Sequence, residues 1–131
     1  MSRILTFPLI VGAILFGLTA CGSAGNTIAV TTTDFHFDPT TWTVSAGQPV
    51  KLTITNKGAN EHEWVLLKKG TAVTQPFDAD DEDKVFWEIE AQPGETKTET
   101  FTAPSEPGTY TVVCGIPAHL EQGMQATLVV K

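Results

Sequence analysis

The sequence predicts an all-β domain, a β-sandwich built from seven to eight short strands. Segments in which apolar and polar residues alternate, the period of a half-buried strand, recur along most of the chain. Combinations of Gly, Pro, Asn and Asp that favour turns separate these segments at short intervals. Beyond the first 20 residues no segment sustains a 3.6-residue helical period, so we expect the strands to pack as two sheets.

The individual strands can be placed in order from this alternation. It is clearest where Val50, Leu52 and Ile54 are separated by polar residues. The expected strands cover residues 27–33, 42–45, 50–55, 63–67, 85–90, 96–101, 110–114 and 125–130. Turn signals between them lie at residues 38–39, 46–49, 56–58, 69–70, 92–94 and 106–108.

Residues 71–84 fit no strand pattern, and we expect them to form an acidic excursion between two strands. Its acidic residues are Asp78, Asp80, Asp81, Glu82 and Asp83. Such a loop is either simply solvated or a patch that steers a basic partner. A calcium loop is a third alternative, although the EF-hand pattern is absent.

Length and composition exclude several classes of protein. The 131 residues suit a single domain, and a hydrophobic content of 41% argues against a disordered chain. Lys and Arg total 8 against 15 Asp and Glu, a net charge of −7, so we expect no nucleic-acid partner. Cys21 and Cys114 are the two cysteines, which allow at most one disulfide and exclude a disulfide-rich scaffold.

Residues 1–20 are expected to be an export signal rather than part of the fold. Arg3 precedes an apolar run over residues 5–18, the pattern of a secretory signal peptide. The run is short for a spanning helix, which needs about 20 apolar residues. An uncleaved anchor remains an alternative to a cleaved signal.

The end of this segment, Leu18-Thr19-Ala20-Cys21, resembles the box at which bacterial lipoprotein signals are cut. The resemblance implies that Cys21 becomes the lipid-carrying first residue and that residues 21–26 form a tether to a domain at residues 27–131. An ordinary signal peptide would leave Cys21 without this role.

One segment carries three residues with metal-binding side chains. Cys114, His119 and Met124 follow one another at steps of five between two expected strands, and His62 lies upstream near the start of another. Together they supply one thiolate, two imidazoles and one thioether, the donor set of a trigonal His₂Cys copper site with a weak axial Met. Soft sulfur donors hold Cu(I), whereas imidazole binds both oxidation states. We therefore expect one copper ion at these four residues.

Each of these residue types also occurs in proteins without a copper ion. A lone Met or Cys is usually a core residue, and His36 is expected to be structural. A Cys–His hydrolase would need an orienting third group and an oxyanion hole, and it would leave Met124 unexplained. A dinuclear copper centre would need two cysteines in the loop, but residue 118 is Ala118. A metal-free domain and a zinc-loaded one remain open.

The order His … Cys-x₄-His-x₄-Met resembles the cupredoxins, the blue copper proteins, and especially the plastocyanin, halocyanin and auracyanin group. The supporting matches are Tyr110-Thr-Val-Val-Cys114, Pro117-x-His119-x₃-Gly123-Met124, Asp34-Phe35-x-Phe37-x-Pro39 and Val44-x-Ala46-Gly47-x-x-Val50. The resemblance covers residues 27–131 and implies a Greek-key sandwich with one type 1 copper. Many relatives carry Asn directly after the first histidine, where it braces the ligand loop, but this chain has Glu63.

The resemblance further implies an electron carrier, not an enzyme, in which the metal cycles between Cu(II) and Cu(I). It implies that His119 is the electron port, within an apolar docking patch that also contains Pro117, Ala118, Leu120 and Ala59. We expect the acidic residues 78–83 to add steering toward basic partners, such as a cytochrome or a membrane oxidoreductase.

A copper-storage, delivery or tolerance module is the main alternative function, and a metal-free interaction domain is the third. We expect a monomer that is exported and lipid-anchored to a membrane, facing the periplasm or the outer cell surface.

Overall fold

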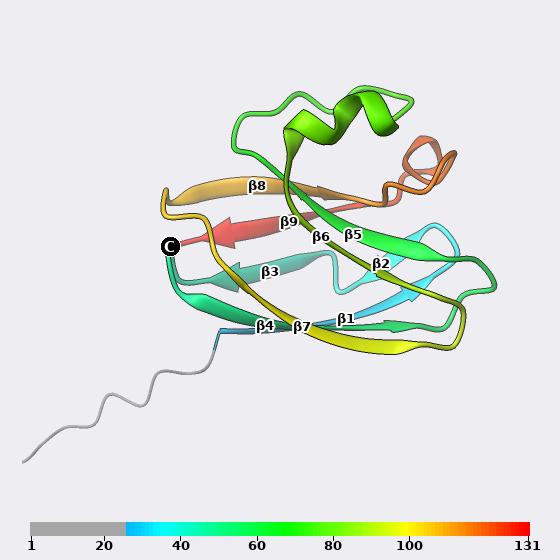
Figure 1. The fold of residues 1–131 in the computed structure, drawn as a ribbon, viewed down its shortest axis with the longest axis horizontal. Coiled ribbons are helices and arrows are strands. Elements are labelled where there is room, and N and C mark those ends of the chain that lie inside the picture. The colour runs from blue at the N-terminus through cyan, green and yellow to red at the C-terminus, as the bar shows by residue number, and fades with distance from the viewer. Residues whose placement is uncertain (1–25) are drawn as a thin grey trace, which may run out of the picture.

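Nine β-strands and two short 3₁₀ helices make up residues 26–131, the part of the chain that the computed structural model describes (Figure 1). The strands are β1 (Thr27–Thr33), β2 (His36–Asp38), β3 (Thr41–Val44), β4 (Pro49–Asn56), β5 (His62–Leu67), β6 (Val85–Ala91), β7 (Thr96–Thr102), β8 (Gly108–Val113) and β9 (Gln125–Val130). The 3₁₀ helices are η1 (Ala79–Lys84) and η2 (Leu120–Gln122). The predicted signal peptide, and the predicted tether as far as residue 25, lie outside the described residues.

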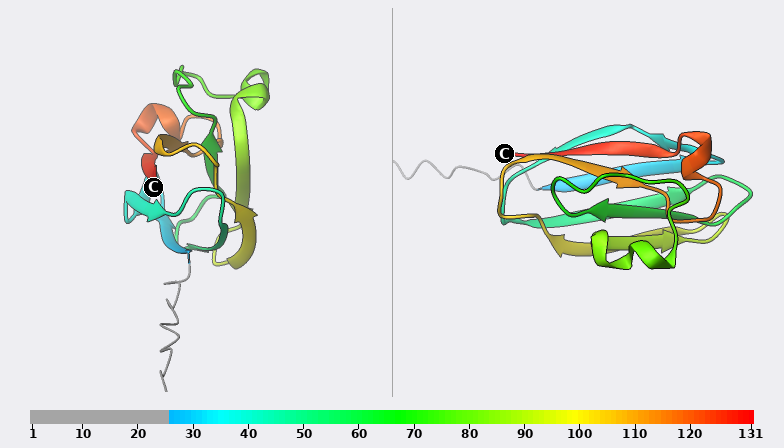
Figure 2. Two further views of the ribbon diagram at one scale, coloured as in Figure 1. Left: turned by 90° about the vertical axis from the view of Figure 1, so that its left-hand side faces the viewer. Right: turned by 90° about the horizontal axis from the view of Figure 1, so that it is seen from above.

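The strands form two sheets that lie face to face, as the two turned views of Figure 2 show. One sheet has the order β2-β1-β4-β7 and the other β3-β9-β8-β5-β6. The β1–β4 and β3–β9 pairs are parallel, and the remaining pairs are antiparallel. The predicted all-β sandwich is confirmed. The ninth strand is β2, whose three residues are too few to show an alternating pattern.

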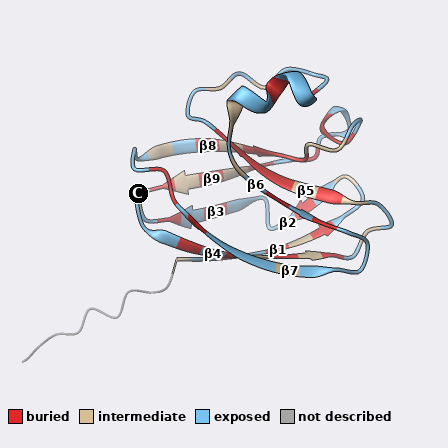
Figure 3. Cartoon of the chain, in the orientation of Figure 1, coloured by how far each residue is buried: buried red, intermediate tan, exposed pale blue. Residues whose placement is uncertain are grey.

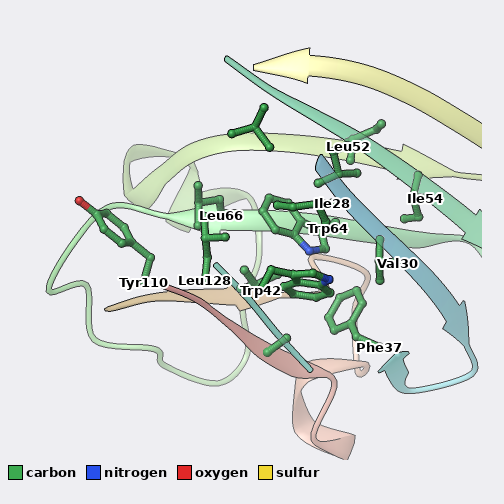
Figure 4. Packing of buried hydrophobic residues seen from close by; sticks show 14 of the residues in the cluster. Ile28, Val30, Phe37, Trp42, Leu52, Ile54, Trp64, Leu66, Tyr110 and Leu128 are labelled. Atoms are coloured by element: carbon green, nitrogen blue, oxygen red, sulfur yellow. The ribbon is translucent and has the colours of Figure 1, made fainter. Parts of the chain in front are cut away.

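The core lies between the sheets, and in strands such as β1, β4 and β9 alternate residues point into it (Figure 3). Val50, Leu52 and Ile54 of β4 are all buried, as their alternation predicts. Trp64 of β5 lies at the centre, and its ring centroid is 5.7 Å from that of Trp42. Figure 4 shows these two indoles surrounded by aliphatic side chains from both sheets.

The acidic excursion differs from the predicted loop because part of it is the helix η1. The Asp78 carboxylate accepts a hydrogen bond from the backbone of Asp80 (3.0 Å), and the Asp78 N–H donates to Asp81 (3.1 Å), which forms a capping box. Asp81 is buried and forms an ion pair with Lys84. Asp81 therefore has a structural role, and its place in the predicted steering patch is wrong.

The fold gathers three loops at the end of the sandwich opposite the C-terminus (Figure 1). They are the β1–β2 turn, the β4–β5 connection that leads to His62, and the β8–β9 loop over residues 114–124. Val65 of β5 pairs with Val113 of β8, so these two strands carry His62 and Cys114 to the same region. Among residues 26–131, no helix is long and apolar enough to cross a membrane.

Candidate metal centre

Three of the predicted ligands come together in the interior at this end of the sandwich. The Cys114 sulfur lies 3.3 Å from Nδ1 of His119 and 4.0 Å from Nδ1 of His62. All three donor atoms lie within 4.8 Å of one another. His62 and Cys114 are 0% exposed, and His119 is 6% exposed. Both imidazoles thus turn the same ring nitrogen toward the sulfur, at a spacing that one metal ion could bridge.

Met124 closes the neck of the ligand loop. Its carbonyl accepts a hydrogen bond from the Cys114 N–H (3.1 Å), and its own N–H donates to the His119 carbonyl (3.1 Å). Its side chain is fully buried in the same hydrophobic cluster as Cys114. The fourth predicted ligand is therefore tied by the backbone to two of the other three.

The chemistry of this donor set fits copper. Thiolate, thioether and imidazole groups suit copper, whereas Ca²⁺ and Mg²⁺ prefer oxygen ligands. A copper ion here would be held by His62, Cys114, His119 and Met124.

The ligand loop owes its shape to two left-handed residues. Ala118 has φ 68° and Gly123 has φ 89°, and the short helix η2 lies between them. The His119 N–H donates to the Ile116 carbonyl (3.1 Å), which closes a turn just before the ligand. This turn directs the imidazole inward, at the cost of placing a non-glycine residue, Ala118, in a sparsely populated conformation.

Glu63 contacts the ligand loop at two points. Its backbone N–H donates to the Cys114 sulfur (3.4 Å). Its carboxylate lies against Gly115, where a Cβ would come within 2.2 Å of Oε2 of Glu63. The departure from Asn therefore leaves the backbone contact to sulfur in place, and the Glu63 carboxylate occupies the space beside Gly115. No side-chain hydrogen bond from Glu63 to the ligand loop is present within residues 26–131.

Burial sets the protonation state of the metal-free site. It raises the pKa of the Cys114 thiol to about 11, although hydrogen bonds from the backbone of Glu63 and Ile116 lower it. Burial and then the charge of His119 lower the pKa of His62, and burial lowers the pKa of His119. At neutral pH the imidazoles are ready to bind a metal, whereas the thiol must lose its proton when the metal enters.

The predicted docking patch is only partly at the surface. Pro117, Ala118 and Ala59 are exposed, but Leu120 is 2% exposed and packs in a cluster with Val65, Leu67, Phe77 and Val113. The assignment of Leu120 to the surface patch is therefore wrong, because η2 turns its side chain inward. His119 is also more enclosed than an electron port was expected to be.

Two residues beside the site were not predicted as functional. The ring of Phe35 meets His119 edge-on, with centroids 5.0 Å apart, and Asp34 lies 3.4 Å from Nε2 of His62. Both belong to the Asp-Phe-x-Phe motif of the sequence. That motif was the only sequence signal for them. Nothing in the local sequence indicates that Asp34 contacts His62, 28 positions away, or that Phe35 contacts His119, 84 positions away.

An acidic groove of about 260 Å³ separates η1 from the outer face of β5 and β6. Its charged lining residues are Glu63, Asp78, Glu82 and Glu88. Gly115 and Pro117 of the ligand loop also line it, so the groove reaches the metal centre. The predicted lipidation site, Cys21, lies outside the described residues.

Comparison with known proteins agrees with this geometry. The model of the cupredoxin-like domain matches residues 7–130. Auracyanin-A of Chloroflexus aurantiacus is 35% identical over 124 residues, which cover 83% of this chain and 71% of that protein. The copper-resistant cuproprotein CopI of Rubrivivax gelatinosus is 31% identical over 115 residues, which cover 82% of this chain and 68% of that protein.

Solved structures show the same relationship. The crystal structure of dithionite-reduced auracyanin from Roseiflexus castenholzii is 29% identical, with a TM-score of 0.68, and covers 82% of this chain and 98% of that one. Auracyanin A of Chloroflexus aurantiacus, described as a blue copper protein, is 34% identical with a TM-score of 0.68, over 80% of this chain and 98% of that one. The chain belongs to the cupredoxin-like family, and His62, Cys114, His119 and Met124 form its type 1 copper site.

Proposed function

We propose that the protein carries single electrons between redox proteins by outer-sphere transfer. The observation that carries this proposal is the burial of the donor set, with His62 and Cys114 0% exposed and His119 6% exposed. A site closed in this way has no room for a substrate at the metal but allows an electron to pass through its ligands. Copper, when bound, supplies the one-electron couple between Cu(II) and Cu(I).

The surrounding chain holds the ligands in one arrangement. Cys114 and Met124 are joined by a backbone hydrogen bond at the ends of β8 and β9. The Glu63 N–H points at the cysteine sulfur and would draw charge from it, which tunes the reduction potential. A rigid donor set that suits both oxidation states needs little rearrangement when the electron moves.

The electron port in this proposal is His119, reached through a small apolar patch. Pro117, Ala118 and Ala59 are exposed, and Phe35 is half-buried with its ring edge on the imidazole. A small uncharged contact of this kind suits brief docking, as weak redox complexes require.

The proposed partners are proteins with basic docking surfaces, such as a cytochrome or a membrane oxidoreductase. The acidic groove supports this, since it places the carboxylates of Asp78, Glu82 and Glu88 beside the ligand loop at Pro117. Asp80 and Asp83 of the excursion are exposed nearby in the sequence. Opposite charges on a partner would raise the rate of encounter.

We further propose that the domain is exported, held at a membrane surface by a lipid on Cys21, and monomeric. The support for export and lipid attachment is the sequence at residues 1–21, a basic start, an apolar run and the Leu-Thr-Ala-Cys box. A tethered carrier searches for membrane complexes in two dimensions.

Copper tolerance or delivery is the second candidate, and the name of the relative CopI favours it. The two functions differ in how firmly copper is held. A carrier keeps its metal through many redox cycles, whereas a delivery protein releases it to an acceptor. His62 and Cys114 are 0% exposed, which favours the carrier.

The test is to add Cu(II) to the purified protein and record its visible spectrum. We expect an intense visible band that ascorbate bleaches and an oxidant restores. The protein should also keep its copper in the presence of a chelator through repeated cycles. Cys114→Ser should abolish the band, and Met124→Leu should keep copper but shift the spectrum and the potential. A colourless wild-type protein would overturn the proposal, and copper loss on reduction would favour delivery.

A further inference from the structure

We propose that Asp34 is a positioning residue for the ligand His62. Its carboxylate would orient the imidazole and keep the ring proton on Nε2, which leaves Nδ1 free for the metal. The inference rests on the copper site of the proposed carrier, but it concerns a residue outside the four ligands.

The hydrogen-bonding needs of His62 support this role. Its Nδ1 faces the Cys114 sulfur at 4.0 Å, so a neutral ring ready for metal carries its proton on Nε2. The residue is fully buried, and a buried N–H needs an acceptor. Nε2 has no aligned hydrogen-bond partner within residues 26–131, and Oδ1 of Asp34, at 3.4 Å, is the acceptor within reach.

Asp34 is itself held in place by the β4–β5 connection. Its Oδ1 accepts hydrogen bonds from the backbone N–H groups of Ala59 (3.0 Å) and Asn60 (3.3 Å). The carboxylate therefore joins the β1–β2 turn to the segment that leads into His62. Two backbone donors fix its position without any contribution from the metal.

The same turn also contacts the second histidine ligand. Phe35 adopts φ 64°, and its ring meets His119 edge-on. The imidazoles of His62 and His119 are 4.9 Å apart. Two consecutive residues thus support both imidazoles, one through a carboxylate and the other through an aromatic edge.

Gly58 provides independent evidence that the contact is close. A Cβ at residue 58 would lie 2.6 Å from Oδ1 of Asp34 and 2.8 Å from Nε2 of His62. The carboxylate and the imidazole can therefore approach each other only because residue 58 has no side chain. Gly58→Ala disturbs the pair from the opposite side without changing any charge.

A carboxylate behind a histidine ligand makes the imidazole a stronger donor. Its negative charge also favours the more positive oxidation state of the metal. Asp34 is therefore expected to stabilise Cu(II) relative to Cu(I) and so to lower the reduction potential of the site.

The first experiment measures the reduction potential of the full chain for wild type, Asp34→Asn and Asp34→Ala. Asp34→Asn should shift the equilibrium between Cu(II) and Cu(I) about tenfold toward Cu(I). For one electron this raises the reduction potential by about 59 mV. Asp34→Ala should also change the visible spectrum and weaken copper binding about 10- to 100-fold, because no acceptor remains.

Glu121→Gln is the matched control. Glu121 and Asp34 both raise the pKa of His119 by their charge, but only Asp34 contacts His62. The control should shift the equilibrium much less than Asp34→Asn and leave the spectrum unchanged. If Asp34→Asn and Glu121→Gln shift the reduction potential equally and Asp34→Ala leaves the spectrum unchanged, Asp34 acts only through its charge. That result would overturn the proposal.

A second experiment needs no copper, so it separates this inference from the proposed function. Nitrogen NMR of the metal-free protein identifies which ring nitrogen of His62 carries the proton. Wild type should hold the proton on Nε2, and both Asp34→Ala and Gly58→Ala should populate the Nδ1–H form. An unchanged tautomer in both variants would overturn the inference even if the protein proves to be a blue copper carrier.

Discussion

Glu63 combines two opposite environments within one residue. Its backbone N–H reaches the Cys114 sulfur, whereas its carboxylate faces the acidic groove. Burial, followed by the charges of Glu88, Glu90 and Glu61, raises the pKa of Glu63 to about 7. A residue that supports the metal-binding cysteine therefore carries a carboxyl group that is costly to ionise.

This carboxyl group makes the stability of the metal-free protein depend on pH. From the ordinary value of 4.5 up to about 7, the folded state binds more protons at Glu63 than the unfolded state does. The contribution of Glu63 to the free energy of unfolding should therefore fall as pH rises through this range and level off above about pH 7. Urea unfolding at pH 5 and pH 8 measures the change.

The control for this prediction is a change that removes the titration. Glu63→Gln should lose this part of the pH dependence and gain stability relative to wild type at pH 8. Asp80→Asn, which changes an exposed carboxylate on η1, should follow the wild-type profile. Parallel profiles for wild type and Glu63→Gln would contradict the assignment.

At the scale of elements, β5 connects the core to the copper site. Its first residue is the ligand His62, and two residues later Trp64 lies at the centre of the sandwich. The Trp64 ring is 5.7 Å from Trp42 and 6.1 Å from both Trp87 and Phe101. The aromatic cluster thus fixes the strand that carries the first ligand.

Trp64→Ala is expected to lower the free energy of unfolding by about 3–5 kcal/mol, because it leaves a large cavity. Trp64→Phe should cost less, since the indole Nε1 has no hydrogen-bond partner within the described chain and none is lost. Denaturant unfolding of the metal-free protein gives both values. Phe86→Ala, at a side chain that is 42% exposed, should cost no more than about 0.5 kcal/mol. An equal loss for Trp64→Ala and Phe86→Ala would refute the central role of Trp64.

The elements also show where sequence patterns suffice. The alternation in β4 predicted a half-buried strand because a period of two places every second side chain in the core. The strand β2 was missed because three residues contain hardly more than one period. The helix η1 was missed because a run of acidic residues is typical of a solvent-exposed loop. In the structure, Asp81 instead is buried and takes part in a capping box and an ion pair.

On the scale of the whole molecule, negative charge gathers beside the ligand loop in the acidic groove. If this charge steers a basic partner, the rate of electron transfer to a basic cytochrome should fall as salt is added. Raising the ionic strength from 0.01 to 0.15 M shortens the Debye length from about 30 to about 8 Å. Stopped-flow measurement of the second-order rate constant tests this.

Charge variants locate the steering. Glu82→Gln and Glu88→Gln should each lower the rate at low salt and flatten its salt dependence. Glu106→Gln removes the same charge near the start of β8, at the opposite end of the sandwich, and should leave both unchanged (Figure 1). A rate indifferent to ionic strength would remove the steering role.

The proposed lipid anchor is tested on the complete chain. Cys21→Ser should move the protein from the membrane fraction to the soluble fraction of a bacterial host and abolish labelling by a radioactive fatty acid. The copper spectrum should stay the same, because Cys21 precedes the domain expected at residues 27–131. Membrane association that survives Cys21→Ser would instead favour an uncleaved anchor.

The sequence by itself determined the sandwich, the family and the choice of copper ligands. Donor type and spacing are local properties, and a Cys, a His and a Met within eleven residues already define a metal-binding loop. The alternation of side chains likewise defines strands without knowledge of their partners.

Only the tertiary structure decided which neighbours support those ligands. Asp34 reaches His62 and Phe35 reaches His119 because the β1–β2 turn and the ligand loop meet at one end of the sandwich. Leu120 is likewise buried against residues far away in the chain, such as Val65 and Phe77. Contacts between residues far apart in the chain depend on how the sheets are paired, and no local pattern of residues records that pairing.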